Sequence, residues 1–420
     1  MMTYLNTLQR TSRDARLYLL TSVLFGFAIF GGIYTTLFNL YLLRLGYDAV
    51  FAGMVNGTGQ FAFGLSAVLF GLLGRWLSTR RLLIAGLGLI TVGFGLIPLA
   101  EFVPVAPEAW IIATHIVAQL GIGLYFVNGG PFLMQVTSPV ERNHVYAMSI
   151  ATWPLSGFAG SLIGGLLPQF VAGPLGMALS EPAPYRYPLW LATLLMLPAI
   201  VAMQFAREIQ PERGDVTAGQ GSTAPLWIIG GVALAVLLRV VGEGVVRTFF
   251  NIYLDVDLRL STVQIGLLMG VAQLLAVPAS MVMPPLAGRW GNGLTYLLGT
   301  WAMMPSLLLI ALIPHWTTAG LGYLGLFACI GLARPAIVAY QMDIVAPEWR
   351  TLMAGATTAA VGLGWAIASL GGGYLAIDAG YGTLFTTGAV LTGLSAAVFW
   401  VAFRPTPPGG GRPDWFNLKD

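Results

Sequence analysis

The stretch F-N-L-Y-L at residues 38–42 recurs as F-N-I-Y-L at residues 250–254, an offset of 212 residues (250 minus 38). Each copy lies at the end of a long apolar run. Self-similarity at a fixed distance is the sequence signature of a duplicated architecture. We therefore interpret the two copies as the equivalent ends of two equivalent helices, one in each half of the chain.

Three further matches follow the same spacing. They are G-R-W at 74–76 and 288–290, P-x-x-R at 139–142 and 347–350, and G-G at 164–165 and 372–373. All occur in the same order in both halves, at offsets between 208 and 214 residues. The sequence predicts two parallel repeats related by an axis along a membrane normal.

Composition places these repeats in a membrane. Of the 420 residues, 57% are hydrophobic and 9% are charged, whereas soluble domains carry about 25% charged residues. A spanning helix needs about 20 mostly apolar residues. The predicted spans are 17–43, 50–73, 81–100, 109–135, 146–171, 188–206, 226–254, 262–287, 294–314, 318–342, 352–377 and 382–403. We expect an all-α integral membrane protein with twelve transmembrane helices in two six-helix bundles related by pseudo-two-fold symmetry.

The distribution of basic residues predicts the orientation. Fourteen of the twenty Lys and Arg residues fall on the side of the N-terminus, three on the other side and three within spans. Basic loops stay cytoplasmic, so we expect a multi-pass protein of the inner (plasma) membrane with both termini cytoplasmic. The expected domains are a bundle at 1–206, a polar cytoplasmic linker at 207–225, a bundle at 226–404 and a disordered cytoplasmic tail at 405–420.

Charge within the seventh predicted span marks a candidate site. Arg239, Glu243 and Arg247 are spaced i, i+4, i+8 and share one helix face. Ionisable residues inside a membrane span mark functional sites by default. The arginines would attract an anionic substrate group, and Glu243 would either hold them or take a coupling proton. The alternative is a structural ion-pair ladder between helices, with Arg247 reaching the interface.

The loop motifs resemble a known family. Residues 284–291 read P-P-L-A-G-R-W-G, similar to the G-x-L-A-D-R-x-G-R-R/K loop between the second and third helices of the major facilitator superfamily. In both halves Gly replaces the usual Asp of that loop. The resemblance implies that these loops and their neighbours take part in conformational switching. The residues concerned are Gly74, Arg75, Arg142, Gly288, Arg289 and Arg350.

The resemblance also implies two bundles that rock about a central site and give alternating access. The cavity of such proteins is lined by the first, fourth, seventh and tenth helices. Arg334, on the tenth, is expected to be a second anion contact or the partner of Glu243, or else to form a packing salt bridge with Asp343. On the fourth helix the expected cavity residues are Gln119, Tyr125 and Asn128, with interhelical hydrogen bonding as the alternative.

The repeated F-N-x-Y-L stretch supplies a candidate gate. Asn39 and Tyr41 in the first half correspond to Asn251 and Tyr253 in the second. Their symmetry suggests a matched extracellular gate. The alternative for the tyrosine rings is anchoring at the membrane interface.

Other functional classes lack their motifs. One Cys and three scattered His leave no metal or disulfide framework, no phosphate-binding loop is present, and no nucleophile motif supports an intramembrane enzyme. We therefore expect a secondary active transporter without cofactor, metal or nucleic-acid partner, acting as a monomer among membrane lipids. The favoured function is export of a small amphipathic or anionic solute, coupled to protons. The alternatives are an organic-anion importer or facilitator and a lipid or lysolipid flippase.

Overall fold

The computed structural model describes residues 12–73, 78–207, 225–346 and 349–403, and these residues are nearly all helical. The helices are α2 (Arg13–Ala28), α3 (Ile33–Arg44), α4 (Ala49–Leu73), α5 (Thr79–Leu96), the 3₁₀ helix η1 (Ile97–Phe102), α6 (Pro107–Val136), α7 (Pro139–Leu175), α8 (Ala183–Leu194), α9 (Met196–Gln204), α10 (Leu226–Val256), α11 (Thr262–Leu312), α12 (Trp316–Ile344) and α13 (Arg350–Phe403). Apolar runs take this form because a helix satisfies its own backbone polar groups in lipid.

Nine helical segments within the described residues are long and apolar enough to cross a membrane. Two of them are far longer than one crossing, since α11 has 51 residues and α13 has 54. Each breaks at a glycine with positive φ, at Gly291 (φ 79°) and Gly380 (φ 82°), a region that glycine adopts without strain. These breaks fall in the predicted gaps at 288–293 and 378–381. The count of twelve spans stays a prediction.

The first predicted span, 17–43, lies within one candidate membrane span, Arg13–Arg44, but this span is not a continuous helix. It breaks between α2 and α3, where Gly31 has φ 86° and the Thr35 hydroxyl donates to the carbonyl of Ile29 (2.7 Å). The Gly31 N–H donates to the same hydroxyl (3.0 Å). Thr35 thus satisfies backbone groups that the break frees. Non-helical backbone at membrane depth is tolerated where protein buries it or where it lines a cavity.

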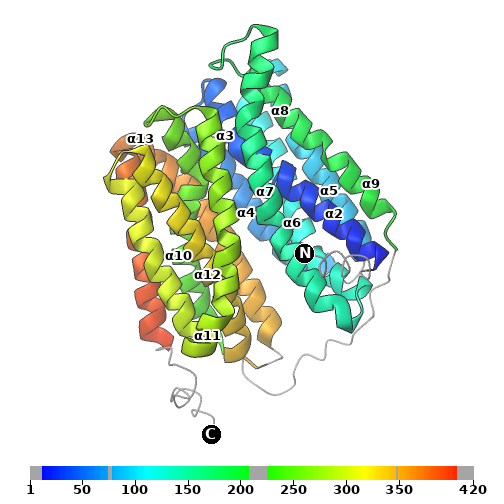
Figure 1. Ribbon diagram of the computed structural model, residues 1–420, viewed down its shortest axis with the longest axis vertical. Helices are drawn as coiled ribbons and strands as arrows, with labels where there is room; N and C mark the ends of the chain where they lie inside the picture. The colour runs from blue at the N-terminus through cyan, green and yellow to red at the C-terminus, as the bar shows by residue number, and fades with distance from the viewer. Residues whose placement is uncertain (1–11, 74–77, 208–224, 347–348, 404–420) are drawn as a thin grey trace.

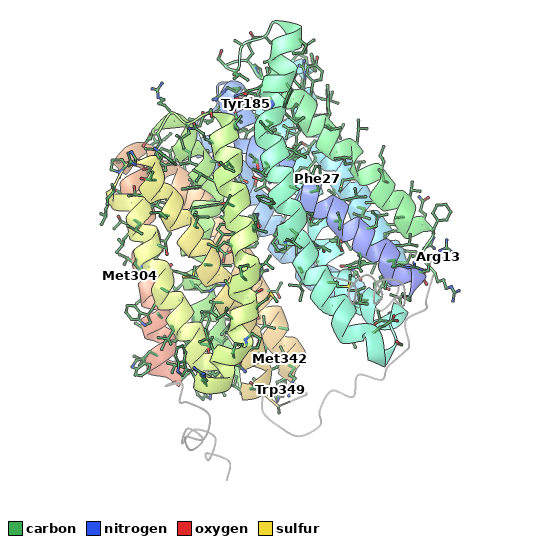
Figure 2. All side chains as sticks on the ribbon, viewed as in Figure 1. Arg13, Phe27, Tyr185, Met304, Met342 and Trp349 are labelled. Atoms are coloured by element: carbon green, nitrogen blue, oxygen red, sulfur yellow. The ribbon has the colours of Figure 1, made fainter. Side chains whose placement is uncertain are left out.

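The helices form two groups (Figure 1), α2–α9 and α10–α13. Figure 2 places Tyr185 at one end of the molecule and Met342 and Trp349 toward the other, and we call these the Tyr185 end and the Trp349 end. The groups lie close together at the Tyr185 end and diverge toward the Trp349 end (Figure 1). We keep the predicted division at 207–225 as a proposal, because 208–224 and the tail at 405–420 lie outside the described residues.

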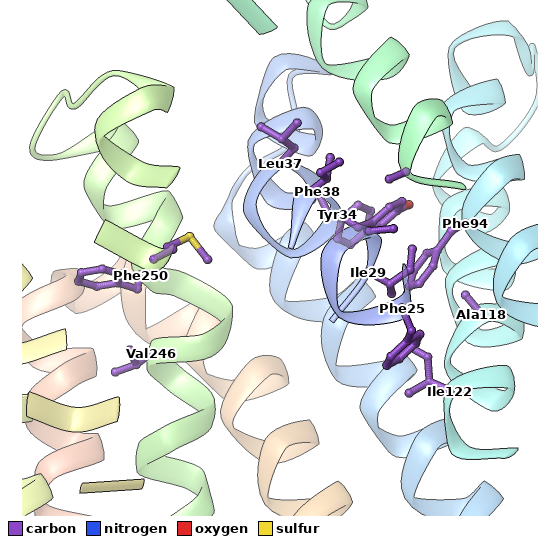
Figure 3. Packing of buried hydrophobic residues seen from close by; sticks show 14 of the residues in the cluster. Phe25, Ile29, Tyr34, Leu37, Phe38, Phe94, Ala118, Ile122, Val246 and Phe250 are labelled. Carbon is purple, nitrogen blue, oxygen red and sulfur yellow. The ribbon is translucent and has the colours of Figure 1, made fainter. Parts of the chain in front are cut away.

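Buried aromatic and aliphatic side chains hold each group together. Figure 3 shows Phe25, Tyr34 and Phe94 close to one another in the first group and Val246 with Phe250 in the second. The rings of Tyr34 and Phe94 are 4.0 Å apart between centroids, and Phe250 stacks on Tyr323 at 4.0 Å. Such pairs add about 0.5–1.5 kcal/mol beyond area burial.

Glycines set the approach between the groups, where α4 packs on α13 and α7 on α11. A Cβ at Gly362 would lie 2.5 Å from Cα of Gly64, and one at Gly165 would lie 2.7 Å from the carbonyl oxygen of Thr262. Small residues allow helix backbones to approach closely in membranes. Larger side chains at these positions would push the groups apart.

We predict that Gly362→Ala lowers the melting temperature of the protein in detergent, because overpacking costs about 1–3 kcal/mol. Gly371→Ala is the matched control on the same helix, since nothing lies within 4 Å of a Cβ there. A Gly362→Ala protein as stable as the control would show that the α4–α13 contact tolerates a methyl group.

Candidate functional site

A cavity of about 380 Å³ lies between the two helical groups. Its wall combines side chains of α3, α4 and α6 from the first group with side chains of α10, α12 and α13 from the second. The volume lies within the range of small-molecule sites, about 300–1,000 Å³. Two arginines, Arg247 and Arg334, line the cavity. None of the described residues that line it is acidic.

The predicted charged row forms as an ion-pair chain along α10. Oε1 of Glu243 accepts from Nε of Arg247 at 2.6 Å, and Oε2 accepts from Nη1 of Arg239 at 3.2 Å. The side chains of Arg239 and Glu243 are each 3% exposed, and that of Arg247 is 25% exposed. Glu243 therefore lies behind the cavity wall, and Arg247 carries the charge of the row to its surface.

Two aromatic rings fix the guanidinium of Arg247. Its Cζ lies 5.4 Å from the ring centroid of Phe327 on α12 and 5.3 Å from that of Trp365 on α13. Cation–π contacts of this kind hold a guanidinium in a defined plane. With Nε bonded to Glu243, the two terminal nitrogens remain available to a ligand. The sequence did not point to either ring, because both come from helices other than the one that carries Arg247.

Arg334 is the second cation of the cavity wall and is exposed to the cavity. Within the described part of the chain it has no hydrogen bond and no ion pair within 4.0 Å. The alternative partner Asp343 accepts instead from Asn292 at 2.9 Å. Glu243 attracts Arg334 electrostatically, together with Arg239 and Arg247. Three arginines thus surround one glutamate, a net formal charge of +2.

The opposite wall is polar but uncharged. The amide of Gln119 lies 3.2 Å from Nε2 of His115, whose ring stacks on Phe38 with centroids 5.0 Å apart. Asn56 and Gln60 of α4 line the same side. This wall offers hydrogen bonds to a ligand without offering charge.

Two predicted cavity residues lie elsewhere. The hydroxyl of Tyr125 hydrogen-bonds Ser22 at 3.0 Å, inside the first group. Asn128 donates to the carbonyl of Leu124, one turn back on its own helix (2.8 Å). Neither lines the cavity. Their spacing from Gln119, six and nine residues, turns them to other faces of the helix, so they do not enter the proposal below.

The gate amides meet across the two groups. Nδ2 of Asn39 donates to the carbonyl of Thr248 (2.7 Å) and to Oδ1 of Asn251 (3.3 Å). Nδ2 of Asn251 donates back to the carbonyl of Thr36 (3.3 Å). Both amides are buried, at 5% and 2% exposure. The repeated asparagines therefore join α3 to α10 beside the cavity, which Asn39 lines.

The gate tyrosines stay within their own groups. The hydroxyl of Tyr41 donates to Glu101 at 2.8 Å, and the ring of Tyr253 packs on Tyr381 with centroids 5.5 Å apart. Both rings are buried, at 0% and 3% exposure. The asparagines and the tyrosines of the repeated motif therefore have different surroundings. The asparagine amides contact the other helical group, and the tyrosine rings pack within their own group.

An ion pair that the sequence analysis missed lies beyond the gate amides. Nη1 and Nη2 of Arg44 donate to the two carboxylate oxygens of Asp255 at 2.8 and 2.7 Å, from α3 to α10. Arg44 also lies over the ring of Tyr185, which places the pair at the Tyr185 end. The available signal was a basic and an acidic residue just after the two F-N-x-Y-L copies.

The predicted switch residues are described in part. Gly74 and Arg75 lie outside the described residues, as does the side chain of Arg142. Gly288 and Arg289 are exposed and lie three and two residues before the break at Gly291. Nε of Arg350 donates to the carbonyl of Met342 at 3.1 Å, linking α13 to the end of α12. Their part in switching stays a prediction.

One family model matches part of the sequence, and solved structures share the fold. The Major Facilitator Superfamily model matches residues 232–416. A crystal structure of the nucleoside transporter NupG is similar with a TM-score of 0.70 and 14% identity, covering 93% of this chain and 100% of that one. The inward open conformation of the xylose transporter XylE from E. coli is similar with a TM-score of 0.74 and 14% identity, covering 94% and 97%. No curated protein sequence matches.

Removal of the carboxylate from the charged row should destabilise the protein. In Glu243→Gln the buried Arg239 loses its counter-ion, and breaking a buried pair costs about 3–5 kcal/mol. We expect a clear fall in melting temperature, with partial recovery in Arg239→Met/Glu243→Gln, which removes both members. Equal stability of Glu243→Gln and the unmodified chain would show that Arg239 needs no partner.

The Arg44–Asp255 pair should hold the Tyr185 end closed. On a Cys329→Ser background, we expect Arg44→Asp to raise the labelling rate of Thr35→Cys by a membrane-impermeant maleimide added at that end. The rise should be about fivefold, since a bidentate pair is worth about 1 kcal/mol. The swap Arg44→Asp/Asp255→Arg should restore slow labelling, and Arg259→Asp, in an exposed loop, is the control. If labelling is equally slow in the Thr35→Cys background, in Arg44→Asp, in the charge swap and in Arg259→Asp, the pair does not control opening of this end.

Proposed function

We propose that this chain is a member of the Major Facilitator Superfamily, whose model matches residues 232–416, and that it carries a small organic anion across the membrane by alternating access to the cavity between its two groups. The family match and the transporter folds that it resembles support a multi-pass transporter rather than an enzyme. The observation that carries the choice of substrate is the wall itself, which presents two arginines and no described acidic residue.

The charge of the wall separates candidate substrates. An organic cation would face Arg247 and Arg334 without a carboxylate to bind it, and like charges at close range cost several kcal/mol. A neutral solute would leave Arg334 without a partner. An anion can pair with both Arg247 and Arg334, because a guanidinium presents a planar fork that matches carboxylate and phosphate oxygens. Seven aromatic rings on the remaining wall suit an apolar or flat body: Phe30, Tyr34, Phe38, Phe63, Phe94, Phe126 and Trp365.

The contacts at the Tyr185 end support access from the Trp349 end in this conformation. Arg44–Asp255 and Asn39–Asn251 join the groups on one side of the cavity, and the groups diverge on the other (Figure 1). With the basic residues concentrated on the terminal side, we propose an inward-facing state with both termini in the cytoplasm of the cell and the protein in its inner (plasma) membrane. We further propose that the chain acts as a monomer.

Proton coupling would have to involve Glu243, the one acidic residue of the cluster. Both its oxygens are bound to arginines, so a proton competes with Arg239 and Arg247 for the same atoms. The predicted direction, export by antiport, stays a prediction, since no contact in the cavity favours export over import.

The test is ligand-induced thermal stabilisation of the purified protein. We expect aromatic carboxylates or phosphate esters to raise the melting temperature, and xylose, a nucleoside and an organic cation to leave it unchanged. At about 100 times the dissociation constant a ligand adds about 2.7 kcal/mol. Arg334→Gln and Arg247→Gln should reduce the shift, and Arg259→Gln, which removes a cation in an exposed loop, should leave it unchanged.

Two outcomes would replace this proposal. Stabilisation by a neutral or cationic solute that survives in Arg334→Gln would exclude anion recognition by the wall. Stabilisation by a lysophospholipid but by no water-soluble anion would favour the flippase alternative, in which the arginines receive a headgroup phosphate.

A further inference from the structure

The charge of the cavity is larger than one negative charge can balance. Arg239, Arg247 and Arg334 interact electrostatically with the single carboxylate of Glu243. Arg239 and Glu243 balance each other at 3% exposure. Arg247 and Arg334 then remain, and both lie on the cavity wall. The protein itself therefore presents two positive charges to whatever fills the cavity.

Water can balance these charges only while the cavity is open. During alternating access the cavity must close at both ends, and a closed cavity holds its charges among wall residues that include the aromatic side chains of Phe63, Phe126 and Trp365. A charge taken out of water without a partner is costly in a low-dielectric site. The wall has no described acidic residue that could serve as that partner. The counter-charges must arrive with the substrate.

Arg247 and Arg334 differ in how firmly the protein holds them before a ligand binds. Arg247 is held between Phe327 and Trp365 and is bonded through Nε to Glu243. Arg334 comes from a different helix, α12, and has no hydrogen bond or ion pair among the described residues. One cation is thus oriented in advance, and the other is free to settle on a second anionic group. A ligand with one negative charge would satisfy one of them and leave the other unpaired.

We infer that the substrate is a dianion, a dicarboxylate or a phosphate monoester, whose two negative charges neutralise Arg247 and Arg334. This inference rests on the proposed function, because it assumes an anion in this cavity. The loaded cavity is then neutral and can close, whereas the empty cavity carries +2 and closes slowly. The transporter accordingly works as an exchanger, in which substrate is needed for each reorientation.

The binding test compares probes that differ by one charge. Phenyl phosphate at pH 8 carries two negative charges, since the second phosphate pKa is about 6, and methyl phenyl phosphate carries one. Phthalate and phthalamate form the second pair. We expect the dianion of at least one pair to bind at least about tenfold more tightly than its monoanion. Arg334→Gln should remove this preference, Arg334→Lys should keep it, and Arg259→Gln should leave it unchanged.

A transport test needs no variant. In proteoliposomes, the labelled dianion should enter several times faster when the lumen contains the same unlabelled dianion than when it contains buffer. Equal uptake into loaded and empty vesicles would overturn the exchange step. Equal binding of monoanions and dianions would overturn the inference and leave the proposed function standing. Binding of no anion at all would overturn both.

Discussion

Glu243 between Arg239 and Arg247 is the interaction on which the site depends. Two guanidinium groups give the buried carboxylate bonded partners in a membrane span, where an unpaired charge would cost several kcal/mol. The two arginines of the row lie at different depths: the side chain of Arg239 is 3% exposed, whereas that of Arg247 is 25% exposed and lines the cavity. With the spacing i, i+4, i+8, the three charged side chains follow one face of α10, and Arg247 is the member of the row at the cavity surface.

The two groups are held by different forces on the two sides of this row. Toward the Tyr185 end, directional bonds dominate, with Asn39 against Asn251 and Arg44 against Asp255. Along α4 and α13, close backbone packing at Gly64 and Gly362 dominates. Hydrogen bonds and ion pairs can exchange partners with water, whereas close-packed glycines allow surfaces to slide. The combination suits a protein whose two groups must separate at one end while α4 and α13 stay in contact.

The sequence was most informative where a pattern is local. The charged row, the breaks near Gly291 and Gly380, and the paired asparagines could all be predicted, because helix spacing and repeats determine them. The break between α2 and α3 could not, since Gly31 and Gly32 lie in an apolar run without a polar interruption. The Arg44–Asp255 pair lies just outside the repeated F-N-x-Y-L stretch and is not itself repeated, so the repeat did not mark it. The rings around Arg247 come from two other helices, which helix spacing along α10 does not reveal.

The bond between Asn39 and Asn251 has a bearing on the origin of the chain. An asparagine amide both donates and accepts, so it can pair with a copy of itself across a two-fold axis. Two separate half-length polypeptides could already have made this contact as a symmetric dimer. The Arg44–Asp255 pair joins positions that differ by one residue in the repeat, so its present form, with one copy only, belongs to the fused chain.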